Sequence, residues 1–336
     1  MSGTPAADAP SVIPGASAEL TGRLLAGLAE VNTLFEGVLQ SEDGFITEAS
    51  GHLAGSGKRF RPLLTLLAAE LGTGRDDQVV KAATAVELIH MASLYHDDVM
   101  DEAELRRAVV SANARYGNST AILIGDLLFG RASALVADLG PEAVRIQADT
   151  FVRLCSGQIR DDRPCPDGVE PVGYYLDVLA DKTGGLIATA ARYGAMFAGC
   201  EPHVVEIMRR YGEQLGIAFQ LADDLLDIAA ESEQSGKTPG TDLREGVRTL
   251  PVLYALASSD PADARLQELL RSDLSEDDAG VEEALTLLRA HPALEEARRY
   301  THAVAQEAQD LLTPLGDNEV TQALRTVAAG VVDRVV

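Results

Sequence analysis

Two long stretches of this sequence contain no proline and no convincing alternation of apolar and polar residues. They cover residues 63–140 and 203–238. Proline breaks the interior of a helix, and half-buried strands alternate with a period of two, so both stretches predict long helices. Other prolines fall where helices are expected to begin or end, at Pro141, Pro171, Pro202, Pro261, Pro292 and Pro314.

The same pattern extends along most of the chain and predicts an all-α protein. Helices are expected near residues 19–40, 42–54, 60–71, 77–103, 112–138, 142–159, 172–198, 203–233, 246–259, 281–290, 293–313 and 317–333. No linker divides them, so we expect a single-domain bundle of long helices around a deep central cavity, over residues 19–336. Residues 1–18 lack the basic and apolar regions of a signal peptide and are expected to form a flexible leader.

Composition narrows the possible partners. The 336 residues include 28 Lys and Arg against 52 Asp and Glu, a formal charge of −24, which argues against nucleic acid as a partner. Any phosphate site must therefore be a local cluster of cations together with metal. The three cysteines show no metal-binding spacing, which favours reduced thiols and a cytoplasmic location.

The pentapeptide Asp-Asp-x-x-Asp occurs twice, at residues 97–101 and 223–227, each time within an apolar stretch that predicts helix. Its first and fifth positions share one face of a helix. Carboxylates crowded near an apolar core are costly to keep ionised without a cation, and Mg²⁺ takes oxygen ligands and completes its shell with substrate phosphates. A single copy of this motif in a protein is more often a solvated surface patch or a helix cap than a metal site. Two copies predict two facing metal sites that hold a diphosphate between them.

Basic residues accompany the acidic motifs. Residues 57–62 open a helix with three cations, and a helix start attracts anions, although such a patch alone is usually a solvated surface. His90 lies about two turns before Asp97, where a second anion would sit, but a lone histidine is more often a core residue. Further candidates for contact with phosphate are Arg106, Arg107, Lys182, Thr183, Gln220 and Lys237.

In this order the motifs resemble those of the trans-prenyl diphosphate synthases, the all-helical class I isoprenoid enzymes. The resemblance covers residues 57–256, through GKRFRP, ELIHMASLYHDDVMDEAELRR, YGNSTAILIGDLLFGRA, the pair GQ at 157–158, DKTGGLI, GIAFQLADDLLDI, GKTPGTDL and REGVRTLPVLYAL. Two positions depart from the family pattern. Val247 stands where a lysine is usual, with Arg248 beside it, and Ala108 replaces a glycine after the first acidic motif.

The resemblance implies roles for these residues. It places Mg²⁺, about two or three ions, on Asp97, Asp98, Asp101, Asp223 and Asp227, and counts Asp224, Lys182 and Lys237 among the catalytic residues. It assigns isopentenyl diphosphate to Lys58, Arg61, His90 and Arg107. It assigns the allylic diphosphate or the nascent cation to Arg106, Lys182, Thr183, Gln220 and Lys237. It also implies a homodimer, with transient membrane contact for product release.

The expected reaction is ionisation of the allylic C–O bond and attack on the cation by the double bond of isopentenyl diphosphate. A terpene cyclase of the same fold is one alternative, although an aromatic content of 4% without Trp counts against it. Another alternative is a non-catalytic subunit of a two-component synthase, which could dispense with the acidic motifs that are intact here.

Product length is predicted from the residues one turn before Asp97. Ala92 and Ser93 are small, whereas bulky aromatics at these positions stop chain growth in short-chain relatives. We therefore expect a long-chain product of the kind used for quinone side chains. The alternatives are close helix packing at both residues, and a farnesyl or geranylgeranyl diphosphate synthase limited by another side chain.

Overall fold

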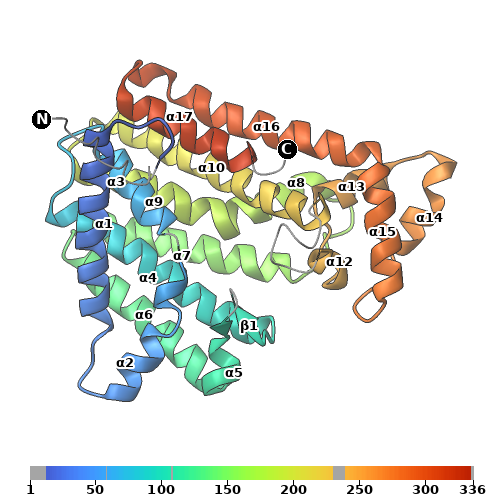
Figure 1. Cartoon of the computed structure of the whole chain (residues 1–336), viewed down its shortest axis with the longest axis horizontal. Helices are drawn as coiled ribbons and strands as arrows, with labels where there is room; N and C mark the ends of the chain where they lie inside the picture. The colour runs from blue at the N-terminus through green and yellow to red at the C-terminus, as the bar shows by residue number, and fades with distance from the viewer. Residues whose placement is uncertain (1–12, 58, 107–108, 230–238, 334–336) are drawn as a thin grey trace, which may run out of the picture. The chain divides into compact units, whose positions relative to one another are not determined.

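The computed structural model describes residues 13–57, 59–106, 109–229 and 239–333 (Figure 1). Almost all of the regular structure there is helical, which confirms the predicted all-α fold. The chain forms two compact units. Unit 1 comprises residues 1–152, 186–212 and 315–326, and unit 2 comprises residues 153–185, 213–314 and 327–336. The predicted central cavity stays a prediction.

Unit 1 is built on α4 (Asp77–Met100), which packs against α1 (Ala18–Leu39), α3 (Phe60–Ala69) and α6 (Asn118–Ala137). Figure 1 shows α4 and α6 running side by side. Asp76 caps α4 by accepting hydrogen bonds from N–H groups of its first turn. Because α4 has neighbours on several sides, its buried residues are not confined to one face. The remaining elements of unit 1 are α2 (Gly44–Gly51), the 3-10 turn η1 (Ala54–Ser56), β1 (Leu105–Arg106), β2 (Val109–Val110) and α5 (Ala112–Tyr116).

Unit 2 begins inside α7 (Pro141–Asp161) and continues through α8 (Pro171–Leu179) and a π-helical turn, η2 (Ala180–Gly184). All of α9 (Gly185–Phe197) except its first residue lies in unit 1, whereas α10 (Pro202–Ala229) and α17 (Glu319–Val332) are each divided between the units. The other later elements are α12 (Thr241–Arg244), α13 (Leu250–Ala257), η3 (Pro261–Asp263), α14 (Ala264–Leu269), α15 (Asp278–Ala290), α16 (Pro292–Leu311) and η4 (Thr313–Leu315). Within this unit α13 packs on α16, and α15 packs on both α14 and α16.

Several predicted helices differ from those observed. The helix expected over residues 112–138 is broken at Gly117, whose φ of +82° belongs to the left-handed region. The helix expected over 77–103 ends at Met100, because Glu102 is left-handed with a φ of +49°. The π-helical turn interrupts the helix expected over 172–198.

Short elements escaped prediction. The antiparallel ribbon β1–β2 pairs Leu105 with Val110 and Arg106 with Val109, and two residues per strand are too few to show alternation. The short helices α12 and α14 were also not predicted from the sequence. Ile13, expected within the leader, is buried, and the N–H of Ser17 donates to Glu319 at 3.0 Å. Ile13 and Ser17 therefore pack on the protein although they precede the predicted boundary at residue 19.

Candidate active site

The first acidic motif ends helix α4, and its second carboxylate is built into the protein. Asp98 is 0% exposed. One carboxylate oxygen accepts the backbone N–H of Ala112 at 2.7 Å, at the start of α5, and the other accepts Nε of Arg106. Arg106 also reaches Asp101 at 3.4 Å. Asp98 thus ties together the end of α4, the β-ribbon and α5, and Arg106 lies on the acidic motif itself.

The outer carboxylates of this motif are more accessible. Asp97 is half-buried and Asp101 is exposed, and an interval of four residues puts them on the same side of α4. Both present oxygen atoms, which are the ligands that Mg²⁺ prefers. Asp98 is fully buried whereas Asp97 and Asp101 are accessible, so Asp97 and Asp101 are the better ligands of the three.

The two described cations of the basic segment at residues 57–62, Arg59 and Arg61, have different surroundings. Arg59 is left-handed, with a φ of +52°, and turns inward. Its guanidinium pairs with Glu87 at 2.9 Å and lies over the ring of Phe35, 4.3 Å from its centroid. Arg61, the second residue of α3, is half-buried on a helix that packs against α4, the helix of His90. Arg59 is therefore structural. Lys58 and Arg107 lie outside the described residues.

The second acidic motif lies near the end of α10, and its second carboxylate is again buried. Asp224 accepts the hydroxyl of Tyr175 and Nε2 of Gln220, the latter at 2.9 Å. Burial raises the pKa of Asp224 to about 6, opposed by these two hydrogen bonds and reinforced by the neighbouring charge of Asp223. Burial and the adjacent Asp224 also raise the pKa of Tyr175. Both partners of Asp224 are neutral donors.

Asp227, the fifth residue of the motif, holds the start of α12. Its two oxygens accept the backbone N–H groups of Thr241 at 3.1 Å and Asp242 at 3.0 Å. A carboxylate at a helix start is favoured by the free N–H groups there. Asp223 is half-buried on α10, and among the described residues it caps no helix. It is the better candidate for a metal in this unit. Lys237 lies outside the described residues.

The π-helical turn brings two further predicted residues toward the second motif. Thr183 Oγ1 lies 3.3 Å from Oε1 of Gln220, which in turn contacts Asp224. Lys182 Nζ donates to Asp161 on α7 at 2.6 Å. Thr183, Gln220 and Asp224 therefore form one continuous array in unit 2, with Lys182 next to it in the chain.

Sequence reasoning missed two residues of this array. Asp161 pairs with Lys182, and its negative charge also raises the pKa of Asp224. Tyr175 lies 49 residues from Asp224, so only the fold reveals their contact. A weak signal existed for Asp161, which follows the Gly157–Gln158 pair by about one helical turn.

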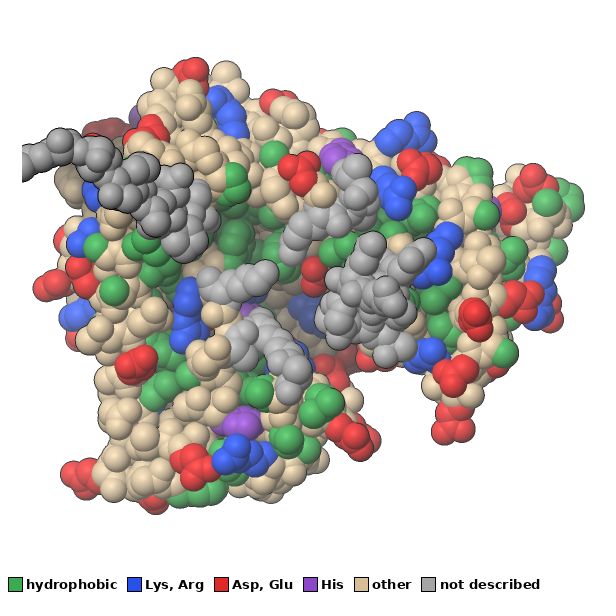
Figure 2. All heavy atoms as spheres, viewed as in Figure 1, with side chains coloured by type: hydrophobic (Ala, Val, Ile, Leu, Met, Phe, Trp, Pro, Cys, Tyr) green, Lys and Arg blue, Asp and Glu red, His purple; other side chains and the backbone are tan. Residues whose placement is uncertain are grey.

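The accessible carboxylates fit Mg²⁺ that is bound jointly by the protein and by substrate phosphates. Within the described ranges, no three Asp, Glu, His or Cys side chains form a ready-made metal cage. Mg²⁺ is commonly held by one or two carboxylates, with waters and substrate phosphates completing its shell. The accessible carboxylates Asp97, Asp101 and Asp223 suit that mode of binding. On the face shown in Figure 2, acidic and basic side chains are interspersed, so the negative charge there is not gathered into one patch.

Comparison with known proteins assigns the family. The model of the polyprenyl synthetase family matches residues 44–288, which include both acidic motifs. The chain is 49% identical over 311 residues to nonaprenyl diphosphate synthase of Mycobacterium tuberculosis, covering 92% of each chain. It resembles the structure of geranylgeranyl pyrophosphate synthase from Corynebacterium glutamicum complexed with calcium and isoprenyl diphosphate, with 42% identity, a TM-score of 0.86 and coverage of 95% and 98%.

A second solved structure gives the same result. Decaprenyl diphosphate synthase from Rhodobacter capsulatus has a TM-score of 0.86 and 34% identity, with coverage of 95% of this chain and 99% of that one. Sequence and fold thus agree over nearly the whole length. The chain belongs to the polyprenyl synthetase family and is a prenyltransferase of all-helical fold.

Proposed function

We propose that this chain condenses isopentenyl diphosphate with an allylic diphosphate and makes a long-chain trans-polyprenyl diphosphate. The observation that carries the proposal is the array Thr183–Gln220–Asp224, together with Lys182 beside it. The array links the Thr183 hydroxyl through Gln220 to the second acidic motif, and Lys182, our candidate cation for a diphosphate, is the next residue in the chain. The likeness to nonaprenyl and decaprenyl diphosphate synthases supports a long product.

Each unit supplies part of the chemistry. Bound Mg²⁺ would supply charge neutralisation for the leaving diphosphate. Asp97 and Asp101 in unit 1, and Asp223 in unit 2, would be its ligands, because these carboxylates are half-buried or exposed and so can be reached by an ion. Lys182 would exchange Asp161 for the allylic diphosphate, and Arg61 and His90 would bind isopentenyl diphosphate. Pre-positioned charges of this kind stabilise the charge that develops on the departing group.

The direct test is product analysis after incubation of the purified protein with isopentenyl diphosphate, farnesyl diphosphate and Mg²⁺. We expect a long-chain diphosphate, and no turnover in excess chelator. Cyclised hydrocarbons would favour a terpene cyclase. Condensation only after addition of a second polypeptide would favour a two-component synthase, and a product that stops at geranylgeranyl diphosphate would contradict the long-chain assignment.

Product length is proposed to depend on Ala92. Ala92 is 1% exposed, and Ser93 turns its hydroxyl back to the carbonyl of His90 at 2.8 Å, so neither presents a bulky group. Ala92→Phe should shorten the product to about three or four isoprene units, because the ring would fill the path one turn below Asp97. Chromatography of the dephosphorylated products measures the change.

A second variant separates a tunnel from simple packing. Ala85 is also fully buried and lies about two turns, or about 10 Å, earlier on the same face of α4. If the chain grows along this face, Ala85→Phe should stop it later than Ala92→Phe does. Equal product lengths in both variants and the wild-type protein would mean that these alanines only permit close helix packing.

We propose further that two copies of the chain pair through α6 and α7. The exposed apolar side chains there include Leu123 at 65% and Val152 at 64%. Among the described helices α6 alone is long and apolar enough to cross a membrane, with 33% of its most apolar window buried. Burial of this face against a second copy would cover it. Sedimentation should show a dimer that Leu123→Glu with Val152→Glu dissociates. Binding of the wild-type protein to lipid vesicles instead would point to membrane contact.

We also propose a cytoplasmic location, because the three cysteines are free thiols.

A further inference from the structure

Helix α7 contacts the π-helical turn η2 through three residues on one of its faces. Arg153, Gly157 and Arg160 follow one another at intervals of four and three, which places them on one face of α7. The turn opposite them, η2, carries Lys182 and Thr183. π-helical turns are rare and occur frequently at functional sites, so the contacts that hold this one are informative.

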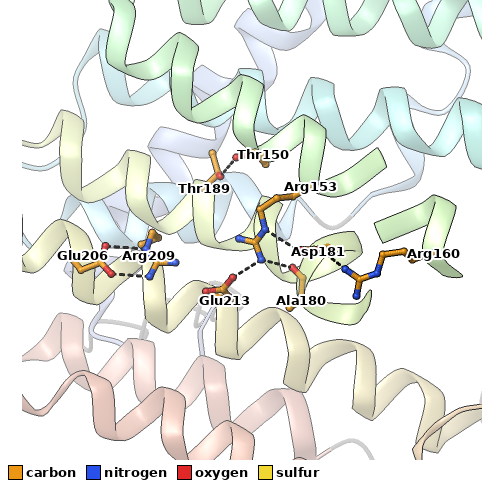
Figure 3. A network of polar contacts seen from close by, with 9 residues as sticks. All are labelled: Thr150, Arg153, Arg160, Ala180, Asp181, Thr189, Glu206, Arg209 and Glu213. Carbon is orange, nitrogen blue, oxygen red and sulfur yellow. Dashed lines mark hydrogen bonds and ion pairs between the residues drawn. The ribbon is translucent and has the colours of Figure 1, made fainter. Parts of the chain in front are cut away.

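Arg153 joins three elements of unit 2 (Figure 3). Its Nε donates to Asp181 of the turn at 2.8 Å, and Nη2 donates to Glu213 of α10 at 2.6 Å. The same nitrogen lies 3.3 Å from the carbonyl oxygen of Ala180. That carbonyl accepts the N–H of Gly185, the bond that spans the π-helical turn. Arg153 therefore contacts the turn at the atom that defines its geometry.

Arg160 and Gly157 complete the contact. Arg160 donates to the second oxygen of Asp181 at 3.1 Å, so two arginines share one carboxylate (Figure 3). A Cβ at Gly157 would lie 2.6 Å from the backbone nitrogen of Lys182, closer than real Cβ contacts. Glycine at this position lets the backbones of α7 and the turn meet between the two arginines.

These contacts differ from an ordinary surface ion pair. The side chains of Arg153, Asp181 and Glu213 are only 36%, 21% and 23% exposed. Burial lowers the pKa of Arg153, but its bonds to Asp181 and Glu213 outweigh that effect and raise it. Partly buried arginine–carboxylate bonds of this kind fix geometry more firmly than exposed pairs.

The turn sends neighbouring side chains to different helices. Lys182 reaches Asp161 on α7, whereas Thr183 reaches Gln220 on α10. We propose that Arg153, with Gly157 and Arg160, is a positioning clamp that fixes the backbone of residues 180–182 so that Lys182 and Thr183 meet the allylic diphosphate. The proposal deepens the proposed function and rests on it. The clamp itself touches the turn and not the substrate.

The test compares variants that remove the clamp while keeping its size. Arg153→Met removes the guanidinium, and Asp181→Asn removes the shared charge with little change in shape. Each should raise the KM for the allylic diphosphate and lower kcat by about tenfold, with the KM for isopentenyl diphosphate within about twofold. Arg153→Lys should recover part of the loss, since it restores charge without the planar fork.

A second readout does not depend on turnover. The chain has only four lysines, Lys58, Lys81, Lys182 and Lys237, so ¹³C-dimethylation gives few NMR signals. The signal lost in Lys182→Arg identifies Lys182. In the wild-type protein this signal should be shifted by the ordered pair with Asp161, and in Arg153→Met it should move toward that of a solvent-exposed lysine.

Arg75→Met is the matched control. Arg75 pairs with Glu30 of α1 at 2.9 Å in unit 1, outside the unit that holds the turn, and its loss should change neither the KM values nor the Lys182 signal. The clamp is overturned if both variants keep the wild-type Lys182 signal, or if both substrates lose affinity equally. If Arg153→Met does not fold, Asp181→Asn decides by the same criteria. A Lys182 signal that responds to Arg153→Met in a protein without prenyltransferase activity would instead overturn the proposed function.

Discussion

The two acidic motifs share one pentapeptide but carry their charge differently. In the first motif the buried Asp98 is paired with a cation, Arg106, and with a backbone N–H at the start of α5. In the second, the donors to the buried Asp224 among the described residues are the neutral Tyr175 and Gln220, and burial raises its pKa. The same Asp-Asp-x-x-Asp pattern thus gives one buried carboxylate that is paired with a cation and one whose pKa is raised by burial.

The difference separates two tasks within each motif. The second aspartate anchors the motif to the protein, whereas the first, Asp97 or Asp223, stays half-buried and accessible. The fifth position follows the local structure. Asp101 ends its helix and is exposed, while Asp227 caps the start of α12. Substitutions at the first position should therefore affect chemistry, and those at the second should affect stability.

The largest expected effect is on turnover. Asp97→Ala and Asp223→Ala should each lower kcat by about a thousandfold or more, since each removes an accessible metal ligand. Their melting temperatures should stay within a few degrees of wild type, because both side chains are only half-buried. Steady-state assays and thermal unfolding measure both. Near-normal turnover of one variant would show that only the other motif binds metal.

Loss of the ion-paired anchor should have the next largest effect. Asp98→Asn leaves Arg106 in a partly buried site without its main counter-charge, at a cost of about 2–4 kcal/mol of unfolding free energy. Asp101→Asn is the matched control, because Asp101 is exposed and 3.4 Å from the same guanidinium. It should cost at most about 1 kcal/mol. Equal losses in urea unfolding would mean that Asp98 is not the anchor.

The cations of the two units should act on different substrates. Arg61→Ala and His90→Ala should chiefly raise the KM for isopentenyl diphosphate, by about tenfold, because charge-assisted bonds to phosphate are strong. Lys182→Ala should chiefly raise the KM for the allylic substrate. Initial rates with each substrate varied in turn separate the two. Equal effects of all three variants on both substrates would contradict this assignment.

Much of the fold and part of the site follow from the sequence. Proline-free apolar stretches predicted the long helices α4, α6 and α10, because their packing needs only local pattern. The motifs identified the acidic residues and Lys182, Thr183 and Gln220. In the structure Gln220 contacts both Thr183 and Asp224, the residue four positions further along α10.

The remaining features depend on contacts between distant residues. No local preference predicts that Arg59 turns toward Glu87, or that Tyr175 reaches Asp224 across 49 residues. The π-helical turn lies in a sequence with good helical pattern, and Arg153 meets it from another helix. The break at Gly117 had a local signal in the glycine itself, but only its φ of +82° shows that the helix ends there.

The smallest expected effect concerns the second anchor and depends on pH. The pKa of Asp224 rises from an ordinary value of 3.8 to about 6 in the folded protein. Between about pH 4 and pH 6 the folded protein therefore holds a proton that the unfolded chain has released, so this group's contribution to stability is lost as pH rises through that window. Asp224→Asn should be more stable than wild type by about 1–3 kcal/mol above pH 7, with a smaller gap at pH 5. The hydrogen bonds can persist, because rotation of the Gln220 amide presents its oxygen to the new NH₂ group and its nitrogen to Thr183. Urea unfolding in chelator, from pH 5 to pH 8, measures the gap. A gap of constant size would mean that Asp224 is ionised throughout, and the two motifs would then carry their charge alike.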